Sequence, residues 1–170
     1  MNQNNFDLIN YNVLLLNRLV DLIDIVDQSK WTLSIKTING ESISRHMRHV
    51  YNFYECFLSG FDDTAIDYDA RIRDESFEQD INYARTKLVN LTSEFSNLDH
   101  KDRELSLFLN KSVSRAQIKT TLRRELMNLI DHSIHHGHII YMGIKNEFPE
   151  IELKDEFYSP STLESIKCAK

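Results

Sequence analysis

The sequence predicts an all-α fold, a four-helix bundle formed by residues 1–170 as a single domain. Four segments repeat apolar residues alternately three and four positions apart, the spacing that places side chains on one face of a helix. The chain has only 4 glycines and 2 prolines, too few for a turn-rich all-β fold. At 170 residues it is long enough to bury a sizeable core.

The first two predicted helices are residues 6–27 and Ser42–Leu58. The first has an apolar face wide enough for a helix packed inside a bundle. Between the two, the helical period is lost and the segment ends in Asn39-Gly40, which is a turn signal. The apolar stripe of the second helix consists of Ile43, Met47, Val50, Tyr54 and Phe57.

A long crossover is predicted after the second helix, whose periodicity stops at Gly60. Its sequence, FDDTAIDYDARIRDES (61–76), is rich in aspartate and arginine. Long loops within compact domains are often functional, so this segment is a candidate part of a site. The third helix is predicted as one continuous helix over residues 76–97.

Residues 105–110 and 116–120 both alternate apolar and polar side chains, which predicts a short β-hairpin before the last long helix. The fourth helix is predicted over residues 121–144. Residues 147–160 are irregular, and Ser161-Thr162-Leu163-Glu164 matches a capping box that predicts a short terminal helix.

The fourth helix carries four of the seven histidines. His132 and His136 are four residues apart and therefore share a face, at the border of the apolar stripe. Two imidazoles in this arrangement can converge on one metal ion, but a third ligand must come from another segment. His135 and His138 fall on the polar side of the helix and receive no role.

Several segments resemble the DinB/YfiT-like family of small helical proteins: SISRHMRHVYNFYECFL, YDARIRD, HSIHHGH and EFYSPSTLESIK. The resemblance covers nearly the whole chain in order. It implies a helical bundle in which one histidine of the second helix and two of the fourth bind a divalent ion. By position, these ligands are His49, His132 and His136.

The choice of ligand on the second helix has an alternative. Periodicity favours His46, which lies nearer the middle of the apolar stripe. The resemblance favours His49, because HVYNFYE matches the family's histidine followed by aromatic residues and an acid. His49 also shares its border position with His132 and His136, where a groove would admit water and substrate. His49 is therefore the preferred ligand, with His46 as the alternative.

Three neutral imidazoles with an open position suit zinc or nickel, which would activate a bound water or thiol. The resemblance implies either a hydrolase-like or a thiol S-transferase-like enzyme with an unidentified small-molecule substrate. Glu125 shares the face of His132 and is a candidate partner for a ligating histidine, although a solvated or salt-bridged role is favoured for it. The crossover offers further candidates, which either orient an anionic substrate or form ion pairs within the loop: Tyr68, Asp69, Arg71 and Arg73.

Composition limits the other function classes. A net charge of −6 argues against a general nucleic-acid binder. No apolar run is long enough for a membrane span, and the N-terminus lacks signal-peptide features, so a cytoplasmic protein is expected. The alternative to an enzyme is an interaction protein or small-molecule binder with a structural or vestigial metal site. A homodimer through the broad apolar face of the first helix is a further prediction.

Overall fold

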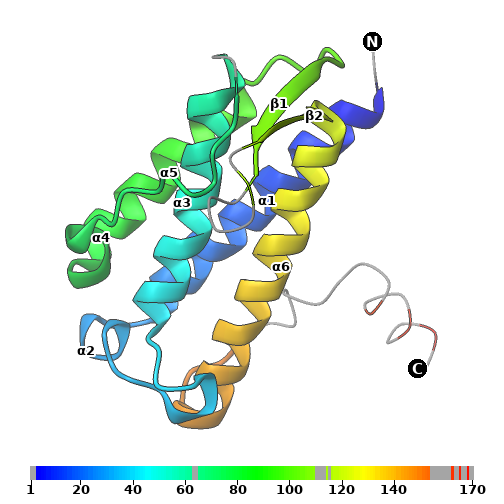
Figure 1. Cartoon of the computed structure of the whole chain (residues 1–170). Helices are drawn as coiled ribbons and strands as arrows, with labels where there is room; N and C mark the ends of the chain where they lie inside the picture. The colour runs from blue at the N-terminus through cyan, green and yellow to red at the C-terminus, as the bar shows by residue number, and fades with distance from the viewer. Residues whose placement is uncertain are drawn as a thin grey trace.

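The computed structural model describes residues 3–62, 65–109, 114, 116–153, 162, 165 and 168 (Figure 1). Most of these residues are helical, which confirms the predicted class. In chain order the elements are α1 (Gln3–Ile25), α2 (Gln28–Trp31), the 3-10 helix η1 (Lys36–Ile38), α3 (Ile43–Phe61), α4 (Glu75–Gln79), α5 (Ile81–Ser96), β1 (Glu104–Phe108), β2 (Gln117–Thr121) and α6 (Leu122–Glu147). In the described part of the chain, no helix has both the length and the apolar character needed to cross a membrane.

The long helices enclose one apolar core. Helix α1 packs against α5 and α6, and α3 packs against the same two helices on the other side. Figure 1 shows these four helices side by side, with the two strands at one end. The largest fully buried side chains in the core are aromatic: Trp31, Tyr54, Phe57, Phe77 and Phe95.

A buried polar network ties α1, α3 and α6 together inside this core. Tyr54 Oη donates to Asn12 Oδ1 at 2.8 Å and lies 2.9 Å from Ser133 Oγ. Because the tyrosine hydroxyl donates to Asn12, Ser133 must donate to Tyr54. Asn12 Nδ2 also donates to the backbone oxygen of Leu126 at 3.1 Å. Buried polar groups are costly unless hydrogen-bonded, so this network specifies how the three helices align.

The second helix extends three residues beyond its predicted end at Leu58, because α3 continues through Gly60 to Phe61. A Cβ atom on Gly60 would lie 2.5 Å from the Cα atom of Ile66 and 2.7 Å from the backbone oxygen of Ala65. Gly60 is therefore a point of close approach between the helix and the crossover, and not a helix terminator. The crossover is fixed there because Ile66 hydrogen-bonds to β1 through Ser106 and Phe108.

The predicted third helix is also wrong in one respect, since it consists of two helices, α4 and α5. Asp80 separates them with an extended backbone (φ −121°, ψ 108°). Its carboxylate accepts hydrogen bonds from the backbone N–H groups of Asn82 and Tyr83 at 2.9 and 3.1 Å. Aspartate is a favoured N-cap because it satisfies these donors, so a new helix begins after Asp80.

The predicted hairpin is confirmed, because β1 and β2 pair antiparallel with Leu107 opposite Ile118. Thr121 then caps α6, its Oγ1 accepting from the backbone N–H of Arg124 at 3.2 Å. Helix α6 extends three residues beyond the predicted end at residue 144. The capping box predicted at residues 161–164 lies outside the described residues, apart from Thr162.

We expect Gly60→Ala to lower the free energy of unfolding by about 1–3 kcal/mol, because the added methyl group meets backbone atoms that cannot rotate away. Urea unfolding measures this change. Ser59→Ala is the matched control, since Ser59 is the exposed neighbour of Gly60 on the same helix, and it should stay within about 0.5 kcal/mol of the wild type. Equal stability of the two variants would contradict the close approach.

Candidate metal centre

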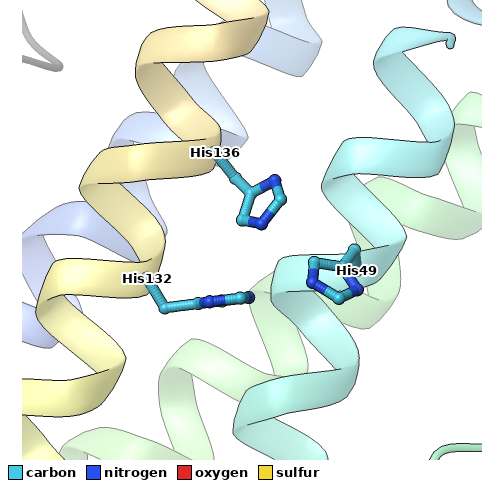
Figure 2. A group of neighbouring side chains, drawn as sticks. All are labelled: His49, His132 and His136. Atoms are coloured by element: carbon cyan, nitrogen blue, oxygen red, sulfur yellow. The ribbon is translucent and has the colours of Figure 1, made fainter.

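Three imidazoles from two helices meet beside the core (Figure 2). His49 comes from α3, and His132 and His136 come from α6. One ligand nitrogen from each residue lies within 4.8 Å of the other two. The ring centroids are 4.5 to 4.8 Å apart. The structure therefore brings together the three predicted metal ligands, in an arrangement compatible with a metal site.

The protonation state of the three rings suits metal binding. Burial lowers the pKa of His132 and of His136 to about 3, and that of His49 to about 4. All three rings are consequently neutral at pH 7, and each has one nitrogen lone pair. His132 Nε2 is buried without a hydrogen-bond partner among the described residues. A buried ring nitrogen of this kind is costly unless a ligand satisfies it, so the cluster fits a metal ion.

His46, the alternative ligand, contacts His136 but is not part of the three-histidine cluster. Its Nδ1 is 3.0 Å from Nδ1 of His136. One of the two rings must donate and the other accept. When His136 donates its Nδ1–H, its lone pair lies on Nε2, the nitrogen that Figure 2 shows pointing toward His49 and His132. The geometry thus groups His49 with the α6 pair and places His46 as a hydrogen-bond partner of His136.

Phe53 forms one wall of the cluster, a role that the sequence analysis did not assign to it. Its ring stacks on His132 with a centroid distance of 3.6 Å and an interplanar angle of 20°. Tyr68 stacks on Phe53 at 5.0 Å, and the edge of His49 meets Phe53 at 5.0 Å. The available signal was spacing, because Phe53 is one helical turn after His49. This aromatic stack restricts how the His132 ring can turn.

Glu125 is buried, with only 2% of its surface exposed, so the solvated or salt-bridged role favoured from sequence is wrong. Its carboxylate accepts from Tyr68 Oη at 2.8 Å and from Thr120 Oγ1 at 2.6 Å. Burial, followed by the charge of Glu125, raises the pKa of Tyr68 well above its usual range, so the phenol keeps its proton. Glu125 thereby anchors the crossover to α6.

Of the other crossover candidates, Arg71 contacts the histidine cluster directly. Arg71 Nη1 donates to His49 Nδ1 at 3.1 Å, and its guanidinium lies 5.1 Å from the centre of the Phe53 ring. Arg73 is exposed and, together with Arg71, lines an open cavity of about 1090 Å³ between α3, α5 and the crossover. Asp69 shapes the crossover, since its backbone N–H donates to Asp67 Oδ1 at 2.9 Å.

Cys56 lines the same cavity and does not join the histidines. Burial raises the pKa of its thiol to about 11. The thiol is therefore protonated at neutral pH and is not poised as a thiolate ligand or nucleophile. Of the remaining α6 histidines, His135 is exposed and His138 stacks on Tyr141.

Comparison with known proteins identifies a family. The model of a protein family described as the DinB family matches residues 1–142, a range that includes the three clustered histidines. A search of the curated proteins found no match, and neither did a search of the solved structures.

The lowered histidine pKa values predict loss of stability in acid. As the pH falls below about 6.5, histidines of the unfolded chain gain protons while the half-buried cluster histidines of the folded protein do not. The free energy of unfolding should therefore fall between pH 6.5 and pH 5, by up to about 1.4 kcal/mol per pH unit for each clustered histidine. Urea unfolding at several pH values, with a chelator present, measures this slope.

His132→Gln should make that slope shallower than the wild-type slope by about one proton. A slope equal to that of the wild type would contradict a neutral, half-buried His132.

Proposed function

The chain belongs to the DinB family, and we propose that it is a metal-dependent enzyme in which His49, His132 and His136 bind one divalent ion. The observation that carries this proposal is the convergence of three neutral imidazoles within 4.8 Å, one with a buried and unpartnered nitrogen. In this proposal the long helices form a four-helix bundle that holds the ion, with two ligands on α6 and one on α3.

The composition of the cluster supports a catalytic ion more than a structural one. Among the described residues, no cysteine or carboxylate joins the three histidines as a fourth ligand. Three protein ligands leave a coordination position open, as in catalytic sites, whereas structural zinc sites usually have four. Imidazole donors suit zinc or nickel.

A bound ion would act as a Lewis acid that lowers the pKa of a water or a small thiol at the open position. The chain's own residues hold the ligands in place for this purpose. His46 lies against Nδ1 of His136, and Phe53 covers one face of His132. Tyr68 closes the far side of Phe53 and is fixed by Glu125.

The nucleophile would come from solution. Cys56 is protonated and does not join the histidine cluster, so it is unsuited to the role. A metal-bound water would give a hydrolase, and a low-molecular-weight thiol would give a thiol S-transferase. Assaying the metal-loaded protein on an activated ester, with and without added cysteine, separates these two reactions.

Single substitutions of the clustered histidines test the proposal. We expect His49→Ala, His132→Ala and His136→Ala each to weaken zinc or nickel binding by at least about a hundredfold, because two imidazoles bind far less tightly than three. Calorimetric titration and elemental analysis of the purified variants measure the affinity and the stoichiometry.

His135→Ala, adjacent to His136 but exposed, is the control and should retain one ion per chain. His46→Ala should weaken binding by about 10–100-fold through the lost hydrogen bond while retaining the stoichiometry. Stoichiometric metal in all three cluster variants would refute the proposed site. Complete loss of metal binding in His46→Ala, together with unchanged binding in His49→Ala, would show that His46 and not His49 is the ligand on α3.

A further inference from the structure

One ring nitrogen of His49 already contacts a positively charged side chain. Arg71 Nη1 lies 3.1 Å from His49 Nδ1. A guanidinium group has only donors and keeps its charge in proteins, so His49 Nδ1 must be the acceptor. A neutral imidazole has a lone pair on one nitrogen and a hydrogen on the other. Its single lone pair is therefore already in use.

His49 cannot accept from Arg71 and ligate an ion at the same time. An ion on Nδ1 would take the lone pair directly. An ion on Nε2 would require the hydrogen to move to Nδ1, where it would face the guanidinium donor. Both routes break the contact between Arg71 and His49. The contact between His136 and His46 differs, because an imidazole can accept as well as donate.

The charge of Arg71 acts in the same direction. Its guanidinium nitrogen lies 3.1 Å from the ring of His49. A positive charge this close to a ligand disfavours a divalent cation on the same ring. Arg71 is thus a competitor of the metal ion by hydrogen bonding and by charge.

The surroundings of Arg71 indicate what the released guanidinium can do. It rests over the face of Phe53 and lies at the border of the open cavity between α3, α5 and the crossover. It is therefore next to both the metal cluster and solvent-accessible space. The planar fork of arginine matches the geometry of carboxylates and other oxyanions.

We propose that Arg71 recognises an oxyanion of the substrate, and that metal binding makes it available by releasing it from His49. This inference rests on the proposed metal site and names the substrate class, a small molecule with a carboxylate or another oxyanion group beside its reacting centre. Anion and metal then favour each other's binding, because an anion paired with Arg71 removes the competitor for His49.

Zinc titrations of three proteins test the competition: wild type, Arg71→Met and Arg73→Met. Methionine preserves the apolar contact with Phe53 and removes the charge and the donor. We expect Arg71→Met to bind zinc about tenfold more tightly than wild type, as expected for removal of an adjacent charge and a competing hydrogen bond. Arg73→Met, at the exposed cavity position, should equal wild type. Unchanged or weaker zinc binding by Arg71→Met would overturn the inference.

Repeating the titrations with chloride replaced by acetate or by sulfate, at constant ionic strength, tests the oxyanion. Zinc affinity of the wild type should rise several-fold relative to that of Arg71→Met. An equal effect on both proteins would overturn the assignment of Arg71 to an anion. If the wild type binds no zinc at all, the proposed function fails as well, whereas zinc binding without a gain in Arg71→Met refutes only this inference.

Discussion

Packing of α3 against α6 is the constraint on which the candidate site depends. Apolar packing alone would allow several rotations of one helix relative to the other. The Tyr54–Asn12–Ser133 network selects one of them, because its buried polar groups are hydrogen-bonded only in that alignment. Ser133 is adjacent to His132, so the same alignment directs His132 toward α3. Burial at this interface also keeps the three rings neutral, because desolvation penalises their charged forms.

The crossover completes the site because it is attached at successive points along its length. Ile66 joins β1, Tyr68 reaches Glu125 on α6, and Arg71 reaches His49 on α3. Near the start of the crossover, Gly60 has no side chain and so leaves room for the Ile66 backbone. The crossover therefore contacts both helices that carry the histidines. Because Arg71 lies on this loop beside the open cavity, we propose that it can leave His49 for an oxyanion.

Sequence periodicity predicted the long helices and the α6 histidine pair, because spacing along one helix fixes which side chains share a face. It missed the break at Asp80, since Phe77 and Ile81 continue the apolar period across the cap. The burial of Glu125 was unpredictable for another reason: its partners Tyr68 and Thr120 come from segments whose position depends on tertiary packing. The same holds for Arg71, whose contact with His49 joins the crossover to α3.

The central claim is that three imidazoles surround one ion. X-ray absorption at the zinc edge of the zinc-loaded protein tests it most directly. The account predicts three imidazole nitrogens at about 2.0–2.1 Å with one further light atom. A first shell of oxygen atoms without imidazole scattering would contradict it.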